Sequence, residues 1–198
     1  MTKIILFDID YTLINTSQLK ENLIDVLTNI IHVKKNDFIK AMSPYTKSLK
    51  SSTDFRPEGY CRFLSKRFGC NYGKLFDAFY KSNKMYENIL YPDTIKLLER
   101  LKEKYILGIF SEGYINFQLT KLKASGILPY FDKKYIFIGR RKLSKKCLDL
   151  IPANSIIIDD NKKVVDILTK NNIKSLWVNR RDSIKQNSIL SVINQSSL

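Results

Sequence analysis

Apolar residues recur along this chain with two different spacings. Residues 4–7 are four consecutive apolar positions that end at two acids, which is typical of a short buried strand. From residue 17 to about residue 88, apolar positions return every three or four residues, as on one face of an amphipathic helix. This pattern predicts helices near residues 17–31, 37–42, 58–68 and 75–86, separated by Ser43-Pro44, by the serine-rich stretch 48–53 and by residues 69–73.

After residue 90 short apolar runs alternate with helical patterns. The expected helices cover residues 93–104, 117–125, 144–150 and 163–171, and the expected strands cover 105–110, 135–138, 155–158 and 175–178. Such alternation predicts an α/β protein in which a parallel sheet has helices on both faces. We therefore expect an α/β core from residues 1–14 and 90–198, interrupted by a helical cap at 15–89. Ile184, Leu190 and Ile193 indicate one last helix after residue 182.

Composition narrows the class of protein. The chain has 198 residues, of which 44% are hydrophobic, and no apolar stretch approaches the roughly 18 to 20 residues of a membrane span. Asp8 and Asp10 interrupt the first apolar run, which is unlike a signal peptide. The three cysteines, an odd number without metal-type spacing, favour reduced thiols in a cytoplasmic protein.

The net charge of +15, from 34 Lys plus Arg against 19 Asp plus Glu, has two explanations. It would attract phosphorylated metabolites, nucleic acid or an acidic membrane face. The chain is also rich in Lys, Ile and Asn, as happens when the base composition of a genome favours their codons. Both explanations stay open at this point.

Polar and charged residues follow each of the first four strands of the predicted core. In open α/β sheets the ligand crevice lies at the carboxyl ends of the strands, so these residues are expected to share one rim. Acids there would be costly to bury without a cation, and a divalent metal such as Mg2+ takes oxygen ligands. The four groups are Asp8 and Asp10, Ser111-Glu112-Gly113, Gly139-Arg140-Arg141-Lys142, and Asp159-Asp160-Asn161.

In these motifs the chain resembles the haloacid dehalogenase-like (HAD) superfamily, most of whose members are Mg2+-dependent phosphatases. Residues 8–12 fit the D-x-D-x-T pattern of the family, and Ser111, Lys142 and the pair Asp159-Asp160 fit its second, third and fourth motifs. The resemblance covers residues 1–14 and about 90–180. It implies a Rossmann-like parallel sheet with a small all-helical cap inserted after strand 1.

The resemblance also implies a role for each acid. Asp8 would attack phosphorus and become an aspartyl-phosphate, and Asp10 would protonate the leaving oxygen and then activate water. Mg2+ would be held by Asp8, by the backbone carbonyl of Asp10 and by Asp160. Asp159 would be either another ligand or the holder of a water molecule.

The remaining motif residues would bind the phosphoryl group or support the loop. Ser111, with the backbone N–H of Glu112, and Lys142 would hold the phosphoryl oxygens. Thr12 would brace the turn through its hydroxyl. Lys145 competes with Lys142 for the third motif, and the extra acid of Glu112 has no explanation in the sequence.

Other residues carry weaker expectations. Asp166 is expected at a helix surface, His32 at a helix end and Trp177 in the core, and Arg140 and Arg141 in a solvated loop that could also contact substrate. Candidate specificity residues of the cap are Tyr45, Lys47, Arg56 and Tyr60.

The expected function is hydrolysis of a small phosphorylated metabolite. Asp10 favours phosphate esters, because dehalogenases of the family lack an acid there and phosphonatases use a lysine of the cap. The alternatives are a nucleotide or nucleic-acid-end phosphatase, phosphoryl transfer within a sugar phosphate, and a non-catalytic binding protein. The sequence sets neither the substrate nor the oligomeric state.

Overall fold

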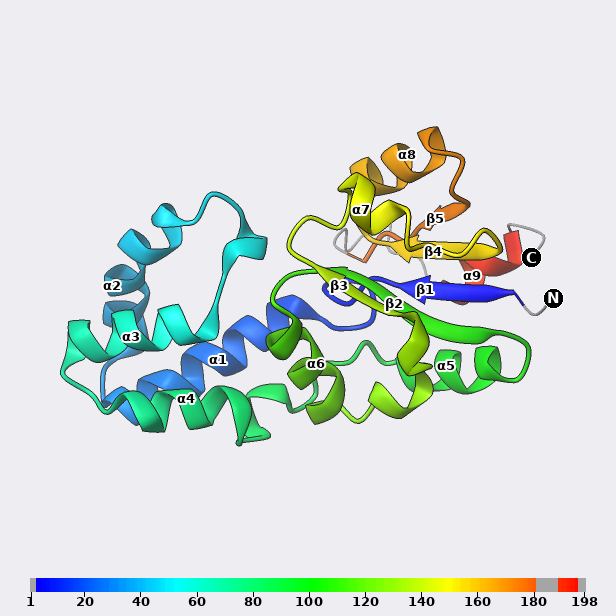
Figure 1. The fold of residues 1–198 in the computed structure, drawn as a ribbon. Helices are drawn as coiled ribbons and strands as arrows, with labels where there is room; N and C mark the ends of the chain where they lie inside the picture. Colours follow the sequence, from blue (N-terminus) through cyan, green and yellow to red (C-terminus); the bar gives the residue numbers. More distant parts are fainter. Residues whose placement is uncertain (1–2, 181–188, 196–198) are drawn as a thin grey trace.

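A computed structural model of the chain describes residues 3–180 and 189–195. Its centre is a five-stranded, all-parallel sheet in the order β3-β2-β1-β4-β5, which confirms the predicted α/β class (Figure 1). The strands are β1 (Ile4–Phe7), β2 (Ile106–Glu112), β3 (Ile136–Gly139), β4 (Ser155–Asp159) and β5 (Ser175–Trp177).

A helical insert separates β1 from β2, as predicted. It contains α1 (Thr16–Ile31), α2 (Lys35–Ser48), α3 (Pro57–Phe68) and α4 (Tyr72–Tyr80), with the 3-10 turns η1 (Ser52–Asp54) and η2 (Lys84–Tyr86). Figure 1 shows these elements beside the sheet, at the end where β1 passes into α1. In a parallel sheet this is the end to which every strand points, so the insert lies next to the predicted site.

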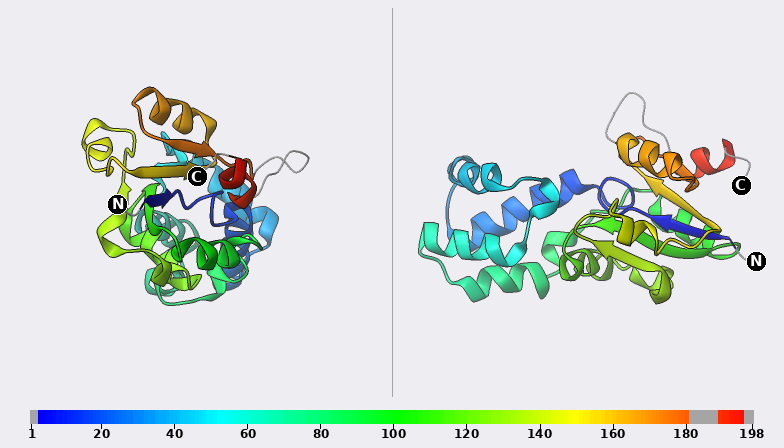
Figure 2. Two further views of the ribbon diagram at one scale, coloured as in Figure 1. Left: turned by 90° about the vertical axis from the view of Figure 1, so that its right-hand side faces the viewer. Right: turned by 45° about the horizontal axis from the view of Figure 1, so that its top comes forward.

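Helices cover both faces of the sheet (Figures 1 and 2). One face carries α5 (Thr94–Lys102) and α6 (Ile115–Ala124), and the other carries α7 (Lys145–Leu148) and α8 (Lys162–Lys170). The 3-10 turns η3 (Leu128–Tyr130) and η4 (Lys133–Tyr135) lead from α6 to β3, and α9 (Ile189–Gln195) contacts β5.

The central strand β1 is buried along its whole length because alternate residues face opposite layers. Ile5 and Phe7 belong to the larger hydrophobic cluster, which continues into the insert. Ile4 and Leu6 pack in a second cluster on the other face of the sheet. The larger cluster thus joins the insert to one face of the sheet.

Two helices of the insert differ from the predicted ones. α2 continues through Pro44 to Ser48 instead of stopping at the proline. Proline removes one backbone hydrogen bond, but the carbonyl that loses it belongs to Lys40, an exposed residue that water can solvate. α4 ends at Tyr80, and the rest of the predicted segment forms the separate turn η2.

Two differences concern the core. β2 extends beyond its apolar run because Ser111 and Glu112 pair with Ile138 and Gly139 of β3. The prediction that Trp177 lies in the core is wrong. The residue is 37% exposed on the edge strand β5, where its indole N–H donates to the Asp160 carbonyl at 2.9 Å.

The remaining expectations have mixed outcomes. His32 is an exposed helix-end residue, as predicted, with the left-handed φ of 60° that closes α1. The predicted last helix is present as α9, whereas Ile184 lies outside the described residues. Among the residues that the structure describes, a search for helices able to cross a membrane found none.

Candidate active site at the carboxyl ends of the strands

The loop after β1 turns sharply enough to send its two acids in different directions. Asp8 still belongs to the sheet, since its N–H donates to the Ile158 carbonyl of β4 at 2.9 Å. The Ile9 carbonyl then accepts the N–H groups of Leu13 and Ile14 at 3.1 and 3.0 Å. Tyr11 has a left-handed φ of 60°, which is unusual outside glycine and marks the tightness of this turn.

Three carboxylates gather where β1 and β4 end. Oxygen atoms of Asp8, Asp159 and Asp160 all lie within 4.8 Å of one another. The Thr12 hydroxyl accepts the N–H of Asp160 at 3.1 Å, so it ties the two loops together. A set of closely spaced carboxylate oxygens is the donor chemistry that Mg2+ prefers, and these residues fit that ion.

Lys142 is the buried cation of this cluster. Its Nζ lies 2.8 Å from Asp8 Oδ1 and 2.5 Å from Asp159 Oδ2. Lys145, the competing candidate, has an 88% exposed side chain and pairs with Asp149, four residues further along the chain. The structure therefore brings Lys142 to the acids and leaves Lys145 in solvent.

Burial and charge act against each other on this pair. Burial raises the pKa of Asp8 to about 7, opposed by the Lys142 ammonium and reinforced by the nearby charge of Asp159. For Lys142, burial works to lower the pKa, but the carboxylates of Asp8 and Asp159 outweigh it and the pKa is raised. Lys142 therefore stays cationic.

Asp10 lies on the other side of the turn and contacts α6. Lys121 Nζ is 2.8 Å from both Asp10 oxygens, Gln118 Nε2 donates to Oδ2 at 3.0 Å, and the Thr16 hydroxyl donates to Oδ1 at 2.8 Å. Burial works to raise the pKa of Asp10, but the Lys121 charge and these hydrogen bonds prevail and lower it. Asp10 is thus an ionised carboxylate with defined orientation, and its side chain is outside the three-acid cluster.

Sequence reasoning missed Lys121 and Gln118. Both are buried, at 4% and 2% exposed, on the face of α6 that also buries Phe117 and Leu122. Polar residues at helical spacing among core positions were the available signal, but the pattern does not say which acid they meet.

Ser111 and Glu112, the last residues of β2, face different surroundings. The Ser111 hydroxyl is buried and accepts a hydrogen bond from Gln118 Nε2 at 3.1 Å. The Glu112 carboxylate instead accepts from the Thr53 hydroxyl of the insert at 3.3 Å and lies 3.7 Å from Arg141 Nη1. The acid that the sequence left unexplained therefore bridges core and insert.

The other candidate side chains lie apart from the acid cluster. Arg140 and Arg141 both contact Asp54 of the insert. Tyr60 is buried among the aromatic rings of the insert, with the Tyr45 ring 5.0 Å away.

Three further candidates lie nearer to solvent. Arg56 pairs with Glu58, Lys47 is exposed, and Asp166 pairs with Lys162 on the surface of α8, as expected for a helix-surface carboxylate.

Comparisons with known proteins give a family match and a curated relative. The family model described as haloacid dehalogenase-like hydrolase matches residues 5–178. A glyceraldehyde 3-phosphate phosphatase of Methanocaldococcus jannaschii is 32% identical over 160 residues, which cover 67% of this chain. The match spans 60% of the length of that relative.

Solved structures share the fold. YfnB of Bacillus subtilis, in a crystal structure with bound magnesium that reveals interdomain movement, superposes with a TM-score of 0.65 at 16% identity and covers 100% of this chain and 99% of its own. The defluorinating L-2-haloacid dehalogenase Rha0230 gives a TM-score of 0.60 at 16% identity, covering 91% of this chain and 82% of its own. At these identities the similarity shows the fold alone.

Proposed function

Because this chain belongs to the haloacid dehalogenase-like hydrolase family, we propose that it is a Mg2+-dependent phosphatase acting on a small phosphorylated metabolite. The observation that carries the proposal is the contrast between Asp8 and Asp10. Two residues apart in sequence, one lies in the three-acid cluster with Lys142 and the other is held by Lys121 outside it. Two carboxylates with separate surroundings suit two separate chemical roles.

The first half-reaction uses both acids. An Asp8 oxygen attacks phosphorus, the bond from phosphorus to the ester oxygen breaks, and the departing oxygen takes a proton from Asp10. Asp10 is ionised in the free protein, so it would take up a proton from solvent when substrate binds, an uptake that the negative charge of the ester beside it would favour. Ser111 and Lys142 lie at the same rim as Asp8 and would hold the phosphoryl oxygens.

The second half-reaction returns the enzyme to its starting state. Asp10, now ionised, accepts a proton from a water molecule while the water oxygen bonds to phosphorus and the bond to Asp8 breaks. Mg2+, held by Asp8, Asp160, the Asp10 carbonyl and Asp159, would supply positive charge against the repulsion between carboxylate and phosphate. The helical insert would cover the site as a cap and exclude bulk water.

Asp10 also separates this proposal from dehalogenation. A halide departs without a proton, so a dehalogenase has no need of an acid at this position. Here Asp10 is held by three side chains, an arrangement that supports a proton-transfer role.

The proposal is tested with p-nitrophenyl phosphate and a panel of phosphorylated metabolites that includes glyceraldehyde 3-phosphate. We expect Mg2+-dependent release of phosphate that excess chelator abolishes and that Asp8→Asn reduces to a trace. Lys145→Met is the matched control and should retain full activity. Hydrolysis by Asp8→Asn at more than a trace, or full activity in chelator, would refute the assignment.

The charge of +15 motivates one alternative, a nucleotide or nucleic-acid-end phosphatase. Binding to a nucleic-acid backbone weakens steeply with salt because counterions are released. A steep rise of KM for oligonucleotide ends between low and moderate salt would favour this substrate class. Salt-insensitive turnover of small sugar phosphates would favour the metabolite.

A further inference from the structure

We propose that Lys121 and Gln118 of α6 are positioning residues. They orient the Asp10 side chain for proton transfer to the leaving group and hold it at a fixed place relative to Ser111. The inference rests on the proposed phosphatase function and deepens it. It starts from the observation that α6 places two buried polar side chains beneath the loop after β1.

Lys121 contacts one of the two proposed catalytic acids, Asp10. Its Nζ lies 2.8 Å from both oxygens of Asp10, and Gln118 and Thr16 each donate to one of these oxygens, so together the three donors orient the carboxylate. The Phe117 ring lies 4.6 Å from the same Nζ and closes the apolar side of the contact. These contacts hold the side chain of Asp10 in one orientation in the free protein.

Gln118 joins Asp10 to β2. Its Nε2 lies within hydrogen-bond distance of Asp10 Oδ2, of Ser111 Oγ and of the Glu112 carbonyl, at 3.0, 3.1 and 2.9 Å. The amide therefore links the proposed acid to the proposed phosphoryl-binding hydroxyl. A change at this residue would displace both groups at once.

Two features indicate that the amide is kept for this link and not for packing. Gln118 Oε1 is buried with no hydrogen-bond partner among the described residues, a cost that an apolar side chain would avoid. Gly113 has a φ of +146°, and a Cβ there would lie 3.2 Å from Gln118 Nε2. The glycine thus leaves room for the amide to reach the end of β2.

The test compares two phosphate esters with different leaving groups. p-Nitrophenolate departs without being protonated, whereas an alkoxide, as from β-glycerol phosphate, needs the proton of Asp10. The ratio kcat/KM reports steps up to departure of the leaving group, so a positioning defect should appear there with the alkyl ester. We expect Lys121→Met to lower kcat/KM by about 10²-fold on the alkyl ester and far less on p-nitrophenyl phosphate.

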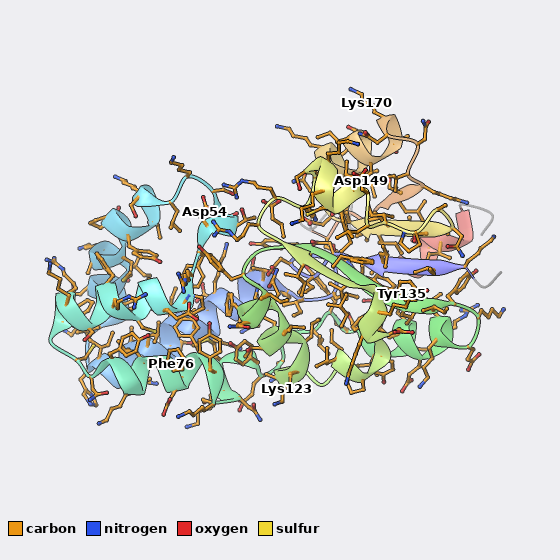
Figure 3. The ribbon with its side chains drawn as sticks, viewed as in Figure 1. Asp54, Phe76, Lys123, Tyr135, Asp149 and Lys170 are labelled. Atoms are coloured by element: carbon orange, nitrogen blue, oxygen red, sulfur yellow. The ribbon has the colours of Figure 1, made fainter. Side chains whose placement is uncertain are left out.

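Further variants distinguish positioning from a structural ion pair. Lys121→Arg should recover most of the loss on the alkyl ester, and Gln118→Met should show the same leaving-group dependence in weaker form. In an Asp10→Asn background, Lys121→Met should have no further effect, because Lys121 acts through Asp10. This pair of variants also keeps the test usable if Lys121→Met alone does not fold. Lys123→Met, which changes an exposed lysine of the same helix (Figure 3), should match the wild type.

Equal losses on both esters would overturn the inference, and so would an added loss in the Asp10→Asn background. Either result would leave the phosphatase function intact, because the wild type would still hydrolyse both esters. A wild type inactive on both esters would instead contradict the proposed function, and the inference would fail with it.

Discussion

Lys142 forms a buried triad with Asp8 and Asp159, in which one cation faces two carboxylates. Lys142→Met should therefore lower the free energy of unfolding by about 3 to 5 kcal/mol in chelator, because removal of one partner leaves buried charge uncompensated. Saturating Mg2+ should recover part of the loss, since the ion would replace the missing positive charge and binds only the folded form. Urea unfolding in chelator and in Mg2+ measures both effects.

Lys145→Met is the control for this experiment, since its exposed side chain contributes only a surface pair and should change stability by no more than about 0.5 kcal/mol. A Lys142→Met protein as stable as the wild type in chelator would contradict the triad. Stabilisation by Mg2+ that persists in Asp160→Asn would separately contradict the three-acid cluster.

Some of the individual site residues could be predicted from the sequence and others could not. Asp8, Asp159 and Asp160 directly follow apolar runs, so their place at the strand ends follows from topology. Lys142 and Lys145 look alike in sequence, and only burial separates them. Lys121 and Asp10 are 111 positions apart in the sequence. Helical spacing shows that Lys121 lies on the buried face of its helix but does not predict which distant acid it contacts.

Gly108 lies in the middle of β2, between β1 and β3, and has no room for a side chain. A Cβ there would lie 2.4 Å from the Tyr135 carbonyl oxygen and 2.6 Å from Leu6 Cδ2. Because the first of these neighbours is backbone, Gly108→Ala should force β2 and the turn before β3 apart. We expect a loss of about 1 to 3 kcal/mol in the free energy of unfolding, measured by urea denaturation.

Gly59→Ala provides the matched control within α3. The nearest atom to a Cβ at Gly59 is the Tyr45 hydroxyl at 3.4 Å, an ordinary contact. Alanine is the better helix former, so this change should raise stability by about 0.5 to 1 kcal/mol. If both variants shifted stability in the same direction, the crowding assigned to Gly108 would be refuted.

Helices and strands were predicted well where the apolar pattern is unbroken. Their ends were predicted less well where strand pairing or exposure to water determines them. The buried strands β1 and β4 carry continuous apolar runs, and their predicted positions hold to within one residue. β2 continues past its apolar run because β3 offers partners to Ser111 and Glu112. Local sequence gives no sign of that partner, just as it gives no sign that Lys40 is exposed enough to tolerate Pro44.

Insert and core are joined by paired backbone, by packed side chains such as Phe55 against Phe117, and by charges. The chain enters the insert at residues 14–15 and leaves it at residues 89–90. These two segments are paired, because the Asn15 N–H donates to the Ile89 carbonyl at 2.7 Å and Ile14 forms a β-bridge with Leu90. At η1, Asp54, which is labelled in Figure 3, contacts Arg140 at 2.6 Å and Arg141 at 3.3 Å. The backbone pairing and the packed rings are buried or half-buried, whereas the contact of Asp54 with the two arginines is made of partly exposed charges.

Asp54→Ala removes the charged contact and leaves the paired backbone and the packed rings in place, so it should let the η1 end of the insert move away from the core without unfolding the protein. Small-angle X-ray scattering should show a larger radius of gyration than for the wild type, while the melting temperature changes little because ion pairs of partly exposed side chains contribute little to stability. Asp149→Ala, labelled as Asp149 in Figure 3, removes an exposed acid that pairs with Lys145 of α7, and this variant should scatter like the wild type.

Salt and pH should act differently on the contact of Asp54 with the two arginines. Hydrogen bonds from Arg140, then from Arg141, hold the pKa of Asp54 below its usual value, even though the little burial it has works to raise it. The contribution of a lowered carboxyl pKa is present above the unfolded value and is lost only as pH falls through the folded one. Wild-type scattering should therefore be the same at pH 5 and pH 8. High salt screens partly exposed charges and should move the wild type toward the Asp54→Ala profile, whereas expansion at pH 5 in low salt would show that another group holds the insert in place.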